Sequence, residues 1–321
     1  MNIILSTLNA RYSHASLGLR YLMANMGALA PATQLQEFVI GVRAADVVEK
    51  LLAHDPVIIG FGVYIWNIDE LTRIVALLKR VAPEVTIVLG GPEVSHETGE
   101  QEIVRLADYV ITGWGDKTFP ALCAQILNGP RPLMKVHVGE QPAMEQIAFP
   151  YEHYSAKDIA HRTVYVEASR GCPFKCEFCL SALDKTAWPF PLDVLLAELE
   201  ALHARGVPVG QVYGTTETGP VSIVLRLPDA IAHVGASGWP QPEAQVKLID
   251  PQGQEVGPGE TGEVCIRAPN VMRGYWNAQG TPGIGLQSSW FHSGDLGQRE
   301  ADGCITIVGR SKDMVISGGE N

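Results

Sequence analysis

Short, almost wholly apolar segments alternate with amphipathic segments through residues 1–130, and this alternation constrains the fold more than any other feature of the sequence. The apolar segments are rich in Val, Ile and Leu, which is typical of parallel strands covered by helices on both faces. They read NIILSTL, LQEFVIG, PVIIGFGVYIW, VTIVLGG and DYVITGW. The helical segments span residues 17–29, 44–55, 68–82, 100–108 and 117–129. Five β–α units in series predict an α/β fold, a doubly wound parallel sheet with right-handed crossovers.

Three glycine-containing loops follow the later strands of this predicted sheet. They are Gly60-Phe61-Gly62, Gly90-Gly91-Pro92 and Gly113-Trp114-Gly115-Asp116. Ligands of such sheets bind at the carboxyl ends of the strands, where these loops lie. Glycine lets a backbone approach a bulky ligand, but it also simply permits a tight turn. None of the loops is a G-x-G-x-x-G fingerprint, which disfavours a dinucleotide. The candidate cofactor-binding residues are therefore Gly90, Gly91, Pro92, Gly113 and Gly115.

Residues 1–130 resemble the cobalamin-binding, Rossmann-like domain that precedes the core of B12-dependent radical SAM enzymes. The likeness is carried by STLNARYSHASLGLRYL, VLGGPEVS and ITGWGDKTFPAL. It implies that the loops after the later strands wrap the corrinoid and its nucleotide tail. Many B12 proteins ligate cobalt through the histidine of D-x-H-x-x-G. Tyr12-Ser13-His14-Ala15-Ser16-Leu17 lacks both the aspartate and the correctly placed glycine, so an ordinary loop role for His14 is favoured over cobalt ligation.

Three cysteines gather on one short loop after a proline-containing linker, residues 131–162. A strand predicted over Val164–Ala168 leads to Cys172, Cys176 and Cys179, spaced C-x3-C-x2-C. Thiolates are the ligands of iron–sulfur clusters, and a short loop can aim three of them at one point. Zinc sites usually need four protein ligands in paired spacing, and no second pair exists here. Structural cysteines tend to be buried singly. The spacing therefore predicts a cluster held by three metal ligands.

The spacing, with Phe178 before the last cysteine, resembles the radical SAM signature. The resemblance implies a [4Fe-4S] cluster whose open iron binds S-adenosylmethionine. An electron donor such as flavodoxin or ferredoxin would reduce it, releasing a 5′-deoxyadenosyl radical that acts on an unidentified small-molecule substrate. An amphipathic helix predicted over residues 190–206 completes one strand–loop–helix unit of a (β/α) barrel. Residues 163–206 then form the start of a radical SAM core, and a second parallel strand should follow.

From residue 207 the pattern becomes that of antiparallel β structure. AQVKLIDPQGQEV, TGEVCIRA and WFHSGDLGQREADGCITIVG alternate apolar and polar residues around DPQG and EADG turns. Cys265 and Cys304 stand singly in these strands, so we expect them to be core residues.

Four stretches of this part resemble adenylate-forming enzymes of the acyl-CoA synthetase type: YGTTETGP (213–220), GEVCIRAPNVMRGYWN (262–277), WFHSGDLG (290–297) and GRSKDMVISGGEN (309–321). The resemblance implies a partial AMP-binding (adenylation) domain over residues 207–321, acting on ATP and Mg²⁺. Its turn at Tyr213, Gly214, Thr215 and Thr216 would pack on adenine and bind the AMP phosphate. Glu217 would approach the magnesium ion. Asp295 and Arg310 would hold the ribose hydroxyls, and Lys312 would lie at the hinge between domains.

Two parts of the ligase pattern are not found in the sequence. The Ser/Thr/Gly-rich phosphate loop should precede YGTTE, and nothing in residues 1–206 resembles it. The small domain with the catalytic lysine should follow SGGEN, the last residues of the sequence. Gly318-Gly319-Glu320 resembles the methionine-binding triplet of radical SAM enzymes. A βα unit of about 30 residues would put that triplet nearer Cys179, so we interpret it as part of the ligase motif.

Three hypotheses follow: a B12-dependent radical SAM enzyme, an acyl-CoA synthetase (AMP-dependent ligase), and a fusion that joins parts of both near residues 206–210. Because each set of motifs is incomplete, we favour a fusion that is not fully active as either enzyme, with a non-catalytic cobalamin-binding module as its simplest form. The net charge of −11 argues against a nucleic-acid partner. No apolar run approaches the roughly 20 residues of a membrane span. Six cysteines without an export signal favour the reducing cytoplasm.

Overall fold

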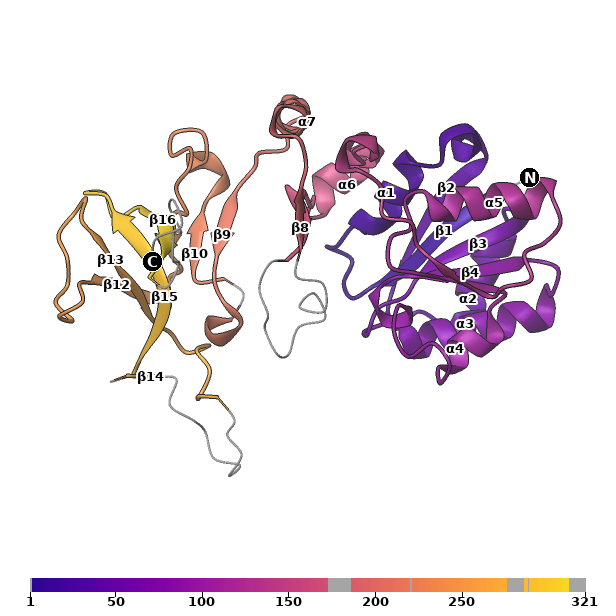
Figure 1. The fold of residues 1–321 in the computed structure, drawn as a ribbon, viewed down its shortest axis with the longest axis horizontal. Coiled ribbons are helices and arrows are strands. Elements are labelled where there is room, and N and C mark those ends of the chain that lie inside the picture. Colours follow the sequence, from indigo (N-terminus) through magenta and orange to yellow (C-terminus); the bar gives the residue numbers. More distant parts are fainter. Residues whose placement is uncertain (1, 173–185, 220, 276–285, 288, 312–321) are drawn as a thin grey trace, which may run out of the picture. The chain divides into compact units, whose positions relative to one another are not determined.

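The computed structural model describes residues 2–172, 186–219, 221–275, 286–287 and 289–311. The chain divides into two compact units, Met1–Val207 and Pro208–Asn321, called unit 1 and unit 2 below (Figure 1). Within the described residues, every helix is too short or too polar to span a lipid bilayer.

Unit 1 contains eight described strands and seven described α-helices. The strands are β1 (Asn2–Asn9), β2 (Thr33–Val39), β3 (Pro56–Gly62), β4 (Thr86–Gly90), β5 (Tyr109–Thr112), β6 (Val136–Val138), β7 (Ser169–Gly171) and β8 (Ala187–Pro189). The helices are α1 (Leu17–Ala24), α2 (Ala44–Leu52), α3 (Ile68–Val81), α4 (Glu102–Leu106), α5 (Thr118–Asn128), α6 (Ala156–His161) and α7 (Leu192–Ala204).

Six of these strands form one parallel sheet in the order β2-β1-β3-β4-β5-β6. Successive residues of β1 point to opposite faces: Ile4 and Leu8 join the core beneath α2, α3 and α4, whereas Ile3 and Leu5 join the core beneath α1 and α5. Figure 1 shows α5 on one side of the strands and α2, α3 and α4 on the other. The predicted parallel sheet covered on both faces is therefore confirmed for the N-terminal part.

The segment expected to be a linker, residues 131–162, contributes to the packing of unit 1. Its strand β6 extends the sheet next to β5. Tyr151 and Tyr154 are 1% and 0% exposed and pack with residues of α7. Arg20 of α1, itself buried, donates to Asp158 of α6 at 3.0 Å. These contacts attach the segment to both the sheet and the last helix of the unit.

The strand before the cysteines differs from the prediction. Val164–Ala168 is not part of a described strand; the strand is β7, three residues long, and it pairs antiparallel with β8. An extended segment needs a partner to become a strand, and the partner available here runs in the opposite direction. The described residues therefore form no parallel barrel strand at this position. The helix predicted after the loop is confirmed as α7. It ends with Gly206 at φ +80° and a 3.1 Å bond from Val207 N to Leu202 O.

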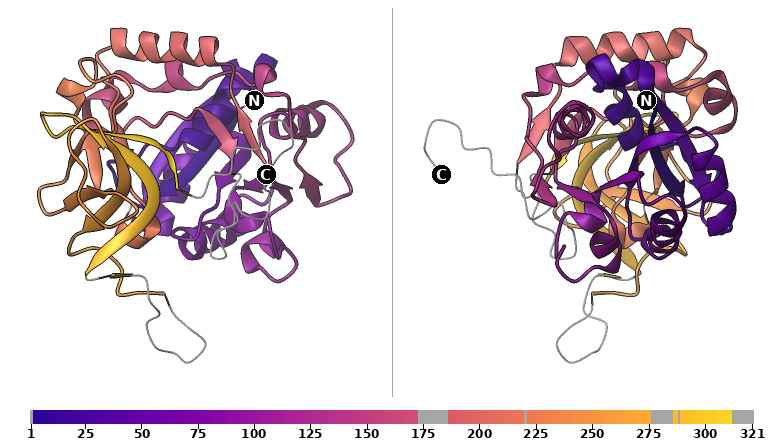
Figure 2. Two further views of the ribbon diagram at one scale, coloured as in Figure 1. Left: turned by 60° about the vertical axis from the view of Figure 1, so that its left-hand side comes forward. Right: turned by 90° about the vertical axis from the view of Figure 1, so that its right-hand side faces the viewer.

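Unit 2 is antiparallel in its described part, as predicted. Its strands are β9 (Gln211–Tyr213), β10 (Ile223–Leu225), β11 (Trp239–Pro240), β12 (Gln245–Ile249), β13 (Thr261–Arg267), β14 (Leu286–Gln287), β15 (Trp290–Arg299) and β16 (Ile305–Arg310). One sheet has the order β11-β10-β9, and the other has the order β12-β13-β15-β14 with β16 also on β15. Figure 2 shows β15 as a long curved strand in yellow. Leu248, Val264 and Ile266 form a buried hydrophobic cluster in the core of unit 2.

Candidate functional site

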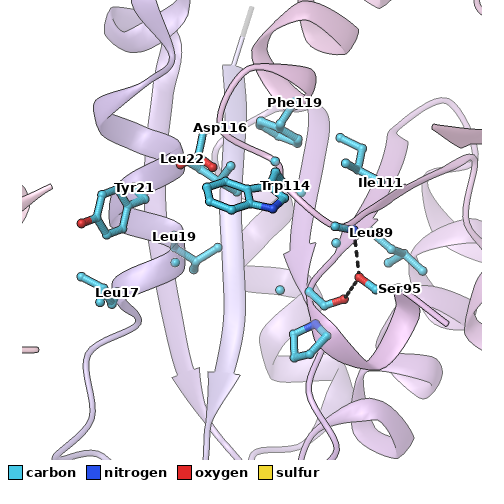
Figure 3. Close-up of a pocket in the computed structure, with 18 of the residues that line it drawn as sticks. Leu17, Leu19, Tyr21, Leu22, Leu89, Ser95, Ile111, Trp114, Asp116 and Phe119 are labelled. Carbon is cyan, nitrogen blue, oxygen red and sulfur yellow. Dashed lines mark hydrogen bonds between the residues drawn. The ribbon is translucent and has the colours of Figure 1, made fainter. Parts of the chain in front are cut away.

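A cavity of about 720 Å³ lies at the carboxyl ends of β3, β4 and β5 in unit 1. All five glycines and prolines predicted to bind a cofactor line it: Gly90, Gly91, Pro92, Gly113 and Gly115. The third glycine loop, Gly60-Phe61-Gly62, lines it as well. The remaining wall is mostly apolar and includes Leu89, Trp114 and Phe119 (Figure 3). The topology therefore gathers the three predicted loops around one cavity.

Ser95 connects two of these loops. Its hydroxyl donates to the carbonyl oxygen of Gly91 at 2.8 Å and accepts from the backbone N–H of Gly113 at 3.1 Å (Figure 3). Ser95 also lines the cavity. Ser95 lies within VLGGPEVS but is not one of the residues predicted to bind a cofactor. A serine four residues after a Gly-Gly pair does not by itself indicate that the serine joins two loops.

Two glycines of the predicted loops, Gly91 and Gly113, have a left-handed backbone but different roles. Gly91 has φ +111°, and a Cβ there would lie 2.5 Å from the carbonyl oxygen of Val63. Gly113 has φ +73°, but a Cβ there would meet nothing within 4 Å. Gly91 is therefore required by the packing of the loop against the end of β3. The space beside Gly113 is open to a ligand.

Arg170, two residues before Cys172, forms part of the cavity wall. Its guanidinium donates to the Asp116 carboxylate at 2.7 and 3.0 Å and to Glu167 at 2.9 Å. It also lies over the rings of Tyr21 and Trp114, 4.4 and 4.9 Å from their centroids. Burial disfavours the charged guanidinium. The hydrogen bonds and charges of Asp116, and then of Glu167, outweigh this effect and raise the pKa of Arg170. The segment leading to the cysteines is thus fixed to the loop after β5.

The cysteine loop falls largely outside the described residues. Cys172 is half-buried and directly follows Gly171, which lines the cavity. Cys176 and Cys179 lie outside the described residues. The start of the predicted cluster loop is therefore adjacent to the cavity.

Two histidines of unit 1 bear on the cobalt-ligand question. His14 is hydrogen-bonded through Nδ1 to the Tyr165 hydroxyl and is stacked on that ring, and it is absent from the described cavity lining. His96, an exposed residue directly after Ser95, lines the cavity. His96 is not one of the residues predicted to bind a cofactor, although its position shortly after Gly90-Gly91-Pro92 is a signal for it.

In unit 2 the residues predicted to contact a nucleotide come together from three strands. The Tyr213 hydroxyl donates to Oδ2 of Asp295 at 2.6 Å, and Nε of Arg310 donates to Oδ1 at 2.6 Å. Asp295 is 6% exposed. Burial, and then the bond to Asp295, raise the pKa of Tyr213, which therefore stays protonated as the donor.

The turn after Tyr213 and Gly214 is held by local hydrogen bonds. Thr215 N donates to the Thr218 hydroxyl at 3.1 Å, and Thr216 begins a short 3₁₀ turn. Glu217 in that turn accepts from the Tyr275 hydroxyl at 2.7 Å. Burial opposes its charge, but this bond, together with the hydrogen bonds from the Glu217 backbone and from Thr215, outweighs burial, so the pKa of Glu217 is lowered. Lys312 and Gly318-Gly319-Glu320 lie outside the described residues.

Two family models match different parts of the chain. The B12 binding domain matches residues 5–123, and the AMP-binding enzyme family matches residues 188–276. Each covers less than half of the chain. The AMP-binding match begins before α7, a helix that we had placed with the cysteine loop and that packs in unit 1. The family match and the structure thus divide the chain at different residues.

Curated relatives are similar to part of the chain. Indoleacetate–CoA ligase of Aromatoleum aromaticum is 40% identical over 123 residues, which are 38% of this chain and 24% of the relative. Feruloyl-CoA synthase of an Amycolatopsis species is 41% identical over 133 residues, or 41% and 26% of the two chains. The chain thus spans about a quarter of the length of these relatives. The solved o-succinylbenzoate CoA synthetase of Bacillus subtilis aligns with a TM-score of 0.35 at 18% identity, covering 99% of this chain and 43% of that one, too weakly to support an argument.

Proposed function

We propose that unit 1 binds a corrinoid at the carboxyl ends of β3, β4 and β5. The observation that carries this is the cavity on which the three glycine loops converge, with Ser95 joining two of them. The match of residues 5–123 to the B12 binding domain supports the same ligand class. A cavity of about 720 Å³ has the size of sites that enclose nucleotide-sized ligands. The glycine loops and apolar side chains that line it would hold the corrinoid and its nucleotide tail.

The lining fits such a ligand. Leu89, Ile111 and Phe119 offer an apolar wall to a heteroaromatic base, and the open space at Gly113 allows the backbone to approach it. His96 is the imidazole of the described cavity lining, so it is the residue that would contact the cobalt of a bound corrinoid. When bound, the corrinoid supplies group-transfer chemistry at its metal, and the chain supplies the fitted pocket and the exclusion of water.

Binding can be measured by titrating hydroxocobalamin into the full chain and following tryptophan fluorescence, since Trp114 and Trp188 both line the cavity. We expect saturable 1:1 quenching. Leu22→Trp, which fills the cavity from α1, should weaken binding at least about tenfold, which is about 1.4 kcal/mol. Met23→Trp is the matched control: Met23 is also on α1 and half-buried, but it does not line the cavity. Equal affinities for both variants would contradict the proposal.

We further propose that Cys172, Cys176 and Cys179 hold a [4Fe-4S] cluster that binds S-adenosylmethionine. The spacing supports this, and so does the position of Arg170 and Gly171 in the cavity wall, which puts the start of the loop beside the corrinoid site. Arg170, held by Asp116, is the residue that positions that start. The radical substrate is a small molecule of undetermined class.

The cluster proposal is tested by anaerobic reconstitution with iron and sulfide. We expect a broad visible absorbance that Cys172→Ala abolishes while leaving hydroxocobalamin binding intact. Reductive cleavage of S-adenosylmethionine to 5′-deoxyadenosine is the expected activity. Reconstitution that Cys172→Ala does not affect would overturn the cluster proposal without touching the corrinoid proposal.

A second candidate function, adenine nucleotide binding by unit 2, is favoured by the convergence of Tyr213, Asp295 and Arg310. A buried carboxylate flanked by a hydroxyl and a guanidinium suits a ribose diol. The match of residues 188–276 to the AMP-binding family supports the same class. Calorimetric titration with AMP should show binding that Asp295→Ala removes. The matched control is Asp302→Ala, a more exposed carboxylate in the same unit. Pyrophosphate release from ATP with an aryl acid would extend the proposal to ligase activity.

A further inference from the structure

Three side chains of metal-ligating type converge in the described part of unit 2. They are Glu263 and Cys265 of β13 and His292 of β15. Nδ1 of His292 lies 3.0 Å from Oε2 of Glu263 and 3.5 Å from Sγ of Cys265, and one ligand atom from each residue falls within 4.8 Å of the others. From its place in the sequence, Cys265 is expected to be only a core residue.

A bulge in the sheet brings the three together. Glu263 and Cys265 are two residues apart and so point to the same face of β13. His292 is the direct cross-strand neighbour of Cys265, and the register shifts between Glu263 and Cys265. The extra residues lie on β15 around Gly294, whose φ of +72° is left-handed. Gly294 N donates to Oε1 of Glu263 at 3.1 Å, which leaves Oε2 directed at His292.

Cys265 is buried on the side of the sheet that does not hold the apolar core. Its neighbours Val264 and Ile266 point into the core with Leu248, so Cys265 points the other way, yet it is 0% exposed. The Glu263 and His292 side chains are 27% and 26% exposed, which gives an ion access from solvent. The thiol is therefore sheltered beneath two ligand-type side chains that reach the surface.

Two cations share this face, and both are engaged elsewhere. Lys247, the cross-strand neighbour of Cys265 on β12, holds its ammonium 4.7 Å from the centroid of the Trp290 ring. Arg267 lies 4.8 Å from the same centroid and donates to Gln245. The site thus has one carboxylate, one thiol and one imidazole, with the positive charges drawn toward Trp290.

We propose that Glu263, Cys265 and His292 form a binding site for a divalent transition metal of the Zn²⁺ type. Thiolate, imidazole and carboxylate are the ligands that zinc takes, and three of them leave a fourth position for water or a small ligand. Ligand atoms of a tetrahedral zinc ion are about 3.3–3.6 Å apart, as follows from its bond lengths. The 3.5 Å separation lies within this range, the 3.0 Å separation lies just below it, and every pair of ligand atoms is within 4.8 Å, so closing around an ion needs only modest side-chain movements. The Gly294 N–H donates to the other carboxylate oxygen, Oε1, and so would fix the orientation of the Glu263 ligand.

The test uses tag-free full chain carrying Cys172→Ala, Cys176→Ala and Cys179→Ala, so that the cysteine loop contributes no thiolate. Titration with Co²⁺ should give one equivalent of a thiolate-to-cobalt charge-transfer band with the strong visible bands of a tetrahedral ion. Competition by Zn²⁺ then gives the zinc affinity. Cys265→Ser should remove the charge-transfer band, and His292→Ala should weaken binding by more than about 100-fold, beyond the usual cost of changing an outer contact. Cys304→Ser, a buried thiol of the same unit, is the matched control and should bind as the parent does.

Glu263→Gln keeps the proposal testable if Cys265→Ser unfolds unit 2. The Glu263 side chain is partly exposed, and glutamine has the same shape but lacks the negative charge of the carboxylate ligand. This variant should retain the charge-transfer band but lower the affinity at least about tenfold. Zinc should also raise the melting temperature of the parent and not that of His292→Ala. Absence of stoichiometric cobalt binding, or binding that none of the three changes affects, would overturn the proposal and leave these side chains as a plain hydrogen-bonded chain.

Discussion

The guanidinium of Arg170 and the carboxylate of Asp116 form two hydrogen bonds, of 2.7 and 3.0 Å, across 54 residues of sequence. Asp116 lies in the loop after β5, at the ligand edge of the sheet, and Arg170 lies on β7, just before the first cysteine. Their side chains are 6% and 16% exposed. A buried pair of this kind couples the loop after β5 to the strand that leads to Cys172.

Arg170→Met should destabilise unit 1 by about 3 kcal/mol, because it leaves the Asp116 carboxylate buried without its partner. Urea unfolding followed by circular dichroism measures this. Arg43→Met is the control, since Arg43 forms an ion pair with Asp46 at the surface and its loss should leave the midpoint unchanged. Equal shifts of the urea midpoint for the two variants would show that the Arg170–Asp116 pair contributes no more to stability than the surface pair. Asp116→Asn together with Arg170→Met should recover part of the loss.

Gly91→Ala and Gly113→Ala should differ although both glycines have a left-handed backbone. The added methyl group at Gly91 would overlap the carbonyl oxygen of Val63, so we expect a loss of at least about 2 kcal/mol. At Gly113 the methyl group enters open space, and only the conformational cost of about 1 kcal/mol applies. Thermal unfolding of both variants distinguishes the two values. A larger loss at Gly113 than at Gly91 would contradict the role given to each loop.

Acid should weaken unit 1 through Asp158. Burial opposes its charge, but the hydrogen bonds from Ser155 and the nearby Arg20 outweigh this and lower its pKa below the ordinary 3.8. The unfolded chain then binds more protons than the folded chain in acid. The stabilisation is fully present above about pH 4 and is lost as the pH falls through the folded-state pKa. Asp158→Asn should cost about 2 kcal/mol at pH 7 and flatten the acid limb of the stability curve. An unchanged acid limb would exclude Asp158 as its source.

The features that could be predicted from the sequence are those that local residue patterns determine. The strands of the parallel sheet follow from runs of Val, Ile and Leu, and the meeting of Gly90-Gly91 with Gly113 follows from parallel strands ending at one edge. The contact of Tyr213, Asp295 and Arg310 followed only from a resemblance.

Other features depend on distant partners that no local pattern names. Val164–Ala168 has strand-like composition, yet the strand forms later because β8 supplies its partner there. No local sequence pattern around Arg170 indicates that its side chain bonds to Asp116. Cys265 looks like any core cysteine until the bulge at Gly294 brings His292 beside it.

Limited proteolysis of the full chain should leave a stable N-terminal fragment that ends near Val207, not near residue 130. Arg205 at the end of α7 donates to the carbonyl oxygen of Tyr151 at 2.8 Å and also to that of Tyr154, so α7 and the preceding segment are held together. Cleavage needs several residues of backbone to become accessible, and proteases generally find them in the segments that connect compact domains. Mass spectrometry of the fragment gives its end. Tyr154→Ala empties a fully buried position and should move cleavage into residues 131–162, whereas Tyr165→Ala, a partly exposed change, should not. A wild-type fragment ending near residue 130, or a chain that resists cleavage throughout, would contradict the division into two units.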